Sequence, residues 1–206
     1  MKLVDTLVEQ DLLEEIIEES KPFIPTEARD LYYLLATPFR YVPFPPGSRF
    51  RSQSDPGVFY GAESVRTAAA EVGYWRWVFL METEGLDRLG PASHTAFSAP
   101  IRARAVDLRI PPFDKESKEW TDPRDYVATQ AFARVARQAG IEAILYLSVR
   151  DPEPSWCAAL LTPKAFASNR PDKETHSWNL LVTRDEAIWR RKPGETFSFS
   201  TSAWKR

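Results

Sequence analysis

The sequence predicts an α+β protein with a single domain, in which helices flank a mixed, mostly antiparallel sheet. The chain has 206 residues, enough for one domain with its own core but too few for two ordinary ones. Apolar residues make up 43% and aromatic residues 13%, so there is ample surface to bury. Helical and strand-like segments do not alternate regularly, as they would in a parallel α/β fold. We therefore assign residues 1–206 to one domain.

Residues 1–25 are predicted to hold an amphipathic helix, which Pro22 and Pro25 end. Apolar residues recur there at three- and four-residue spacing, with glutamates between them. Such an acidic face is most often solvated, although it can also dock a partner. The segment has no apolar run long enough for a signal peptide or a membrane span, so we expect a cytoplasmic protein without membrane contact.

The next segment, residues 38–57, is rich in proline and glycine, which predicts extended stretches and turns. A short β-prone run ends at Tyr60, and Ser64 is a suitable N-cap for a helix that begins at Val65. Glu71 then lies about two turns into that helix. The apolar run over residues 75–81 fits either a longer helix or a new strand.

The second half of the chain shows further strands and one clear helix. Residues 101–106 alternate like a half-buried strand, and later strands are expected at 141–147, 156–161, 178–183 and 196–200. Between them, Asp122 can cap a helix that Gly140 stops. The predicted buried face of this helix consists of Val127, Ala131, Phe132 and Val135. Residues 167–206 thus hold C-terminal strands and a tail.

Composition excludes several classes of function. The formal net charge is −2, which argues against a protein that binds nucleic acid with its whole surface. Cys157 is the only cysteine, so there is no internal disulfide, and His94 and His176 are far apart in the chain. We expect no metal site.

Three arginines, Arg40, Arg49 and Arg51, lie within twelve residues on the proline-braced segment. Guanidinium groups bind phosphate oxygens bidentately, so a rigid pair suits a polyphosphate. The alternative is that these side chains pair with surface acids. Composition alone does not separate the two interpretations.

Arg49, Tyr60 and Glu71 follow one another at intervals of eleven residues, on a loop, a strand end and a helix that can converge on one cleft. Tyr60 by itself is typical of a core aromatic residue. Glu71 stands among alanines and a valine, where a carboxylate is costly unless it is paired or used. We therefore predict a functional role for Glu71.

The sequence resembles the RES domain family in three blocks that occur in the family's order. These blocks are TPFRYVPFPPGSRFR, GVFYGAESVRTAAAEVGYWRW and ILYLSVRDPEPSWCAALLTP, which lie within residues 37–166. Arg49, Tyr60, Glu71 and Ser148 match the family's arginine, tyrosine, glutamate and serine, and Arg40 with Tyr41 matches an upstream arginine-tyrosine pair.

The resemblance implies a fold similar to ADP-ribosyltransferase toxins and an enzyme that degrades NAD. The reaction is hydrolysis, or phosphorolysis with inorganic phosphate as co-substrate; NAD is the substrate and no cofactor is needed. It also implies a toxin of a bacterial toxin–antitoxin pair, neutralised by an Xre-type antitoxin with a helix-turn-helix domain. A homo-oligomer or a hetero-oligomer with the antitoxin is compatible with this.

The chemistry of NAD agrees with these residues. Nicotinamide leaves from a cationic pyridinium, so no general acid is needed and one carboxylate, Glu71, is sufficient. Arg49, with Arg40 or Arg51, would hold phosphate, and Tyr60 or Tyr41 would contact the nicotinamide or a ribose hydroxyl. Ser148 would hydrogen-bond the ribose or the carboxamide, although a serine in a turn is more often a local cap.

Two other functions remain as alternatives. One is transfer of ADP-ribose to a protein, which needs the same arginine and glutamate. The other is a non-catalytic module that touches nucleic acid through residues 75–77 or 189–192, where tryptophan adjoins basic residues. For these segments the simpler interpretation is that the tryptophans fill the core while the basic side chains face water.

Overall fold

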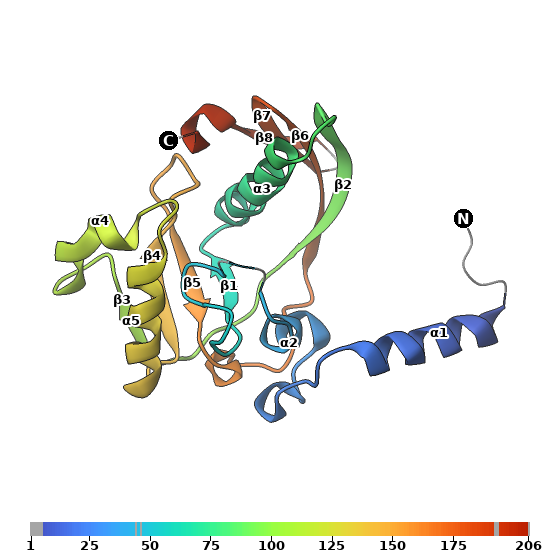
Figure 1. Ribbon diagram of the computed structural model, residues 1–206, viewed down its shortest axis with the longest axis horizontal. Helices are drawn as coiled ribbons and strands as arrows, with labels where there is room; N and C mark the ends of the chain where they lie inside the picture. Colours follow the sequence, from blue (N-terminus) through green and yellow to red (C-terminus); the bar gives the residue numbers. More distant parts are fainter. Residues whose placement is uncertain (1–5, 44, 46, 192–193, 206) are drawn as a thin grey trace.

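The computed structural model describes residues 6–43, 45, 47–191 and 194–205 and has the predicted α+β architecture (Figure 1). The helices are α1 (Leu7–Ser20), α2 (Tyr33–Arg40), α3 (Val65–Glu82), α4 (Ser117–Trp120) and α5 (Val127–Gln138). The strands are β1 (Phe59–Ala62), β2 (Arg88–Phe97), β3 (Ala105–Asp107), β4 (Ala143–Leu147), β5 (Trp156–Leu160), β6 (Thr175–Thr183), β7 (Glu186–Arg191) and β8 (Glu195–Ser200).

The strands form two sheets, where the sequence analysis expected one. The first has the order β1-β5-β4-β3, and only its β3–β4 pair is parallel. The second has the order β2-β6-β7-β8 and is antiparallel throughout. The expectation of mostly antiparallel pairing is confirmed. Strands β2 and β7 were not predicted, and the strand expected at 101–106 is reduced to β3 and an isolated bridge between Ile101 and Phe166.

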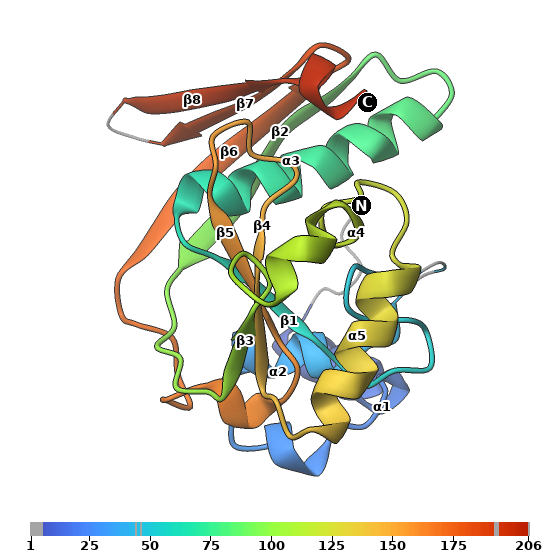
Figure 2. The same ribbon diagram turned by 90° about the vertical axis from the view of Figure 1, so that its left-hand side faces the viewer.

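Helix α3 supplies one wall of the cavity described below and also packs on the second sheet (Figure 2). It begins at the predicted cap, where the Ser64 side chain accepts a hydrogen bond from the Thr67 amide, and it continues through residues 75–81. Its sheet-facing side is mostly apolar and contributes Ala70, Trp77 and Leu80 to the larger core cluster. Gly73 permits the close approach, because a Cβ atom there would lie 3.3 Å from the Trp204 ring.

The other side of α3 faces the first sheet. Ala68, Glu71, Val72 and Trp75 recur at helical spacing and line one cavity. Because the two sides of one helix serve a core and a cavity, any shift of α3 on the second sheet moves Glu71.

Helix α5 covers the first sheet, but of its predicted buried face only Phe132 packs against the core. Val127 and Val135 are 73% and 62% exposed, whereas the buried residues are Thr129, Ala133 and Ala136. Small side chains let the helix approach the sheet closely, and the Thr129 hydroxyl also donates to the Arg49 carbonyl at 2.5 Å. The spacing of apolar residues alone does not show that the small side chains, rather than the larger ones, face the sheet.

Helix α1 projects away from the rest of the molecule (Figure 1), and none of its residues is buried. A capping box of Thr6 and Glu9 starts it. At its other end Glu18 pairs with Arg40 at 2.6 Å, and Arg40 also donates to the Pro22 carbonyl. In the described ranges no helix has the length and apolarity needed to cross a membrane.

Burial predicts that truncating an exposed isoleucine and a buried leucine will change the free energy of unfolding by very different amounts. Ile16→Ala in α1, where the side chain is 54% exposed, should change the free energy of unfolding by less than ~0.5 kcal/mol. Leu180→Ala in β6, where the side chain is 1% exposed, should cost ~2–5 kcal/mol through lost burial and the remaining cavity. Urea denaturation of both variants measures this difference, and equal destabilisation would contradict the projecting position of α1.

Candidate active site

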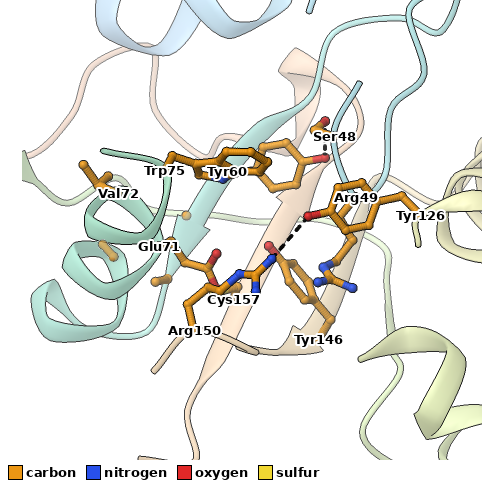
Figure 3. A pocket seen from close by; sticks show the side chains of 13 residues that line it. Ser48, Arg49, Tyr60, Glu71, Val72, Trp75, Tyr126, Tyr146, Arg150 and Cys157 are labelled. Atoms are coloured by element: carbon orange, nitrogen blue, oxygen red, sulfur yellow. Dashed lines mark hydrogen bonds between the residues drawn. The ribbon is translucent and has the colours of Figure 1, made fainter. Parts of the chain in front are cut away.

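A cavity of about 280 Å³ lies where α3, β1, β5 and the loop at residues 48–51 meet (Figure 3). Arg49, Tyr60 and Glu71 all line it, so the three residues spaced eleven apart do converge. The remaining wall is largely aromatic and is formed by Trp75, Tyr126 and Tyr146. Such a mixture of apolar walls with a few convergent polar groups is typical of ligand sites.

Glu71 is held by one strong donor. The Ser148 hydroxyl donates to Glu71 Oε1 at 2.7 Å, and the Cys157 thiol lies 3.9 Å from the same oxygen. Burial raises the pKa of Glu71, against the opposing effects of the Ser148 hydrogen bond and the charges of Arg150 and Arg49. The carboxylate is therefore a high-energy group when ionised, which is the condition expected of a residue kept for chemistry.

Two buried guanidinium groups face the same cavity. Arg49 is 8% exposed and donates to the Trp120 carbonyl at 2.9 Å, with its guanidinium 5.0 Å from the centroid of the Tyr126 ring. Arg150 is 4% exposed and lies 3.4 Å from the centroid of the Tyr74 ring. It donates to the Pro123 carbonyl at 2.5 Å.

Neither arginine forms an ion pair within the part of the chain that the structure describes, although the charge of Arg49 also acts on the Asp122 carboxylate. Their hydrogen bonds go to carbonyl and phenol oxygens, and Glu71 acts on them across the cavity without forming an ion pair. A buried guanidinium group that no carboxylate contacts directly is costly, so an anion that enters the cavity would be stabilised by both. The site therefore combines an anion-binding side with a single carboxylate.

Tyr60 both lines the cavity with its ring and binds the neighbouring loop with its hydroxyl. Its hydroxyl accepts a hydrogen bond from the Phe50 amide at 2.9 Å and pairs with the Ser48 hydroxyl at 2.9 Å. Burial of that hydroxyl raises the pKa of Tyr60 to about 12, although the residue is 37% exposed and its ring lines the cavity. Tyr60 thus holds the loop that carries Arg49 and stays neutral.

Ser148 lies behind Glu71 and does not line the cavity. Its oxygen also accepts from the amides of Arg150 and Asp151, at 3.3 and 3.2 Å, so it caps the bend as well as holding the carboxylate. The bend is fixed further by Trp204, whose indole donates to the Arg150 carbonyl at 2.8 Å. One segment therefore positions both Glu71 and Arg150.

Arg40, Tyr41 and Arg51 are not brought into the cavity. Arg40 is occupied by Glu18 and the Pro22 carbonyl at the base of α1. Arg51 is buried but turns the other way, donating to the Tyr41 carbonyl at 2.7 Å and the Asp55 carbonyl at 3.2 Å. Tyr41 is 40% exposed and serves Arg51 through its backbone. Arg51 and the Tyr41 backbone thus brace the loop, whereas Arg40 holds the base of α1.

Sequence reasoning missed Arg150, because it was taken as part of a bend although it stands two residues after Ser148 in the third motif block. It also treated residues 75–77 as one unit: Trp77 is 7% exposed and fills the core, but Trp75 is 50% exposed and lines the cavity. Trp189 is buried in the core, as the simpler interpretation held, and Lys192 lies outside the described residues. Cys157 has a pKa raised to about 12 by burial, so its thiol is no thiolate nucleophile.

The structure is that of an α+β protein with one cavity that two buried arginines and a single glutamate line. The model of the RES domain family matches residues 24–183, most of the chain, and the chain belongs to this family. RES domains are found in toxins of toxin–antitoxin systems, and such toxins typically pair with an antitoxin. No curated protein matches the sequence. The matched range leaves out α1.

The buried carboxylate should lower stability at neutral pH. An ordinary glutamate has a pKa of 4.5, and Glu71 has a higher one in the folded protein. The folded state therefore binds more protons than the unfolded state between these values, so this contribution is present below pH 4.5 and is lost as pH rises through the raised pKa. Glu71→Gln should become more stable than the parent over that range.

Urea denaturation of both proteins from pH 4 to pH 8 tests this. The exposed Glu82→Gln is the matched control and should show no such pH-dependent difference. A Glu71→Gln protein that is less stable than the parent at neutral pH would contradict the assignment of a costly buried carboxylate.

Proposed function

We propose that this protein degrades NAD by cleaving the bond between nicotinamide and ribose. The C–N bond breaks, its electron pair neutralises the pyridinium nitrogen, and nicotinamide leaves. A new C–O bond forms between the same carbon and an oxygen of phosphate or water, and the acceptor's proton passes to solvent. The products are nicotinamide and either ADP-ribose 1″-phosphate or ADP-ribose. The supporting observation is one cavity lined by two buried guanidinium groups, which form no ion pair within the described residues, and by one partly buried carboxylate.

The carboxylate of Glu71 stabilises the cationic ribosyl group that develops as nicotinamide leaves. Its charge is attracted to this cation in a low-dielectric cavity, where it is worth more than in water. Ser148 occupies one carboxylate oxygen, Oε1, and so directs Oε2 toward the cavity or the ribose hydroxyls. Nicotinamide departs as a neutral molecule from a cationic pyridinium and needs no acid, which agrees with a site where Tyr60 and Cys157 both have raised pKa values of about 12.

Arg49 and Arg150 bind phosphate oxygens. This is the role predicted for Arg49, while Arg150 replaces Arg40 and Arg51 as its partner because those two face away from the cavity. The same pair can hold either the pyrophosphate of NAD or an incoming inorganic phosphate. We include both acceptors in the proposal.

The partner we propose is an Xre-type antitoxin with a helix-turn-helix domain, which would neutralise the enzyme in the cytoplasm. The proposal is supported by the family's occurrence in toxin–antitoxin pairs and by the motif resemblance. We propose that NAD enters as substrate and that no further cofactor takes part, since a pyridinium leaving group supplies its own driving force.

Incubation of the purified protein with NAD, with and without inorganic phosphate, tests the reaction. We expect nicotinamide release, and Glu71→Gln should lower it by ~100-fold or more because the developing cation loses its counter-charge. Glu82→Gln should match the parent. Label from NAD that becomes fixed on protein would favour the transferase instead, and an unimpaired Glu71→Gln variant would refute the catalytic role.

The arginine pair gives a separate prediction about binding. Arg49→Ala and Arg150→Ala should each raise the KM for NAD by ~10-fold or more, because one charge-assisted phosphate contact is lost. Arg40→Ala, outside the cavity, is the matched control and should leave KM unchanged. Initial rates over a range of NAD concentrations measure this, and a larger effect at residue 40 would overturn the assignment.

A further inference from the structure

A second cavity, of about 590 Å³, adjoins the candidate active site. The two share Tyr60, Gly61 and Ala62 of β1 and Ala68 of α3 as lining residues. Strand β1 is an edge strand of the first sheet, and alternate residues of a strand point to opposite faces. Tyr60 thus faces one side and Phe59, which lines only the second cavity, faces the other. The two cavities meet around the edge of β1.

The second cavity differs in chemistry from the first. Aromatic side chains from both sheets and the adjoining loop contribute to its walls: Phe59, Phe97, Trp156 and Phe166. Its charged lining residues are Glu63 and Glu174, with His176 beside Glu174 at 3.2 Å, and no arginine or lysine is among the residues that line it. Glu63 accepts from the Ser155 hydroxyl at 3.2 Å. Arg109 acts on Glu63 and lies 5.5 Å from the centroid of the Trp156 ring, but it is not among the lining residues. The cavity therefore offers ring faces and carboxylate acceptors.

We infer that this second cavity holds the adenosine half of NAD, while the phosphates stay beside Arg49 and Arg150. The inference rests on the proposed function. A cavity of about 280 Å³ falls at the lower end of the range for small ligands, so a dinucleotide needs room beyond it. Adenosine presents a π-face for the aromatic walls, together with an amino group and two ribose hydroxyls that can donate to carboxylates.

The two carboxylates also set a specificity. An acidic residue that accepts from the ribose 2′-hydroxyl favours NAD, whereas the 2′-phosphate of NADP would place an anion beside it. Glu63 and Glu174 therefore act as specificity residues that select NAD over NADP. They belong to the second cavity only and are distinct from Glu71.

Binding of adenosine 5′-monophosphate (AMP), followed by calorimetry, tests the subsite without any need for catalysis. Thr95 on β2 is exposed and lines the second cavity, so Thr95→Trp should fill it and weaken AMP binding by about tenfold or more. Ser93→Trp is the matched control, because Ser93 is exposed on the same side of the same strand but lines neither cavity. It should bind AMP like the parent.

The specificity is tested by kcat/KM for NAD and NADP. The parent should prefer NAD by at least about tenfold, and the double variant Glu63→Gln with Glu174→Gln should narrow that preference. A control pair of exposed residues away from the cavities, Glu82→Gln with Glu84→Gln, should leave it unchanged.

The outcomes separate the two proposals. NAD consumption without AMP binding, or AMP binding that Thr95→Trp does not weaken, overturns the subsite and leaves the proposed function standing. AMP binding that Thr95→Trp abolishes, in a parent protein that does not consume NAD, supports the nucleoside site and overturns the proposed reaction. If the double glutamine variant prefers NAD over NADP as strongly as the parent does, the specificity role of Glu63 and Glu174 is overturned.

Discussion

A carboxylate that is kept apart from two nearby cations is the constraint on which this structure depends. Glu71 accepts a hydrogen bond from the Ser148 hydroxyl at 2.7 Å. Arg49 and Arg150 donate their hydrogen bonds to carbonyl and phenol oxygens. A direct ion pair between these charges would relieve their burial cost but would also close the cavity. The fold instead holds the charges apart, so that an anionic ligand completes them. This arrangement is the basis of our proposal that the cavity takes a substrate with both phosphates and a cationic ring.

Each of the three groups is held by a different part of the fold. Glu71 is part of α3, and the apolar core on the second sheet fixes the position of that helix. Arg49 lies on a loop of the proline-rich segment, and Tyr60 and Thr129 hold this loop through hydrogen bonds. Arg150 lies on a bend that is held by Trp204, near the C-terminus, because the Trp204 indole donates a hydrogen bond to the Arg150 carbonyl. The site is thus assembled from both sheets, and residues far from it in sequence control its geometry.

The sequence analysis found the site through spacing and chemistry, and it failed where contacts decide. The cap at Ser64, the helix beyond it and the strands β4, β5, β6 and β8 agree with local patterns, because caps and apolar periods act over a few residues. The buried face of α5 did not agree, since a row of small residues competed with a row of larger apolar ones and only close packing chose between them. The two-sheet arrangement was likewise beyond local patterns.

By itself the sequence determined the fold class, the convergence of positions 49, 60 and 71, and the family, because these depend on residue types and on spacing along the chain. Only the tertiary structure decided which arginines share the cavity. Arg40 and Arg51 are arginines like Arg150, but Arg40 pairs with Glu18 and Arg51 turns to the Tyr41 carbonyl, so neither lines the cavity. Whether a charge is free to bind a ligand depends on what surrounds it in three dimensions, and that information is not carried by the charge's place in the chain.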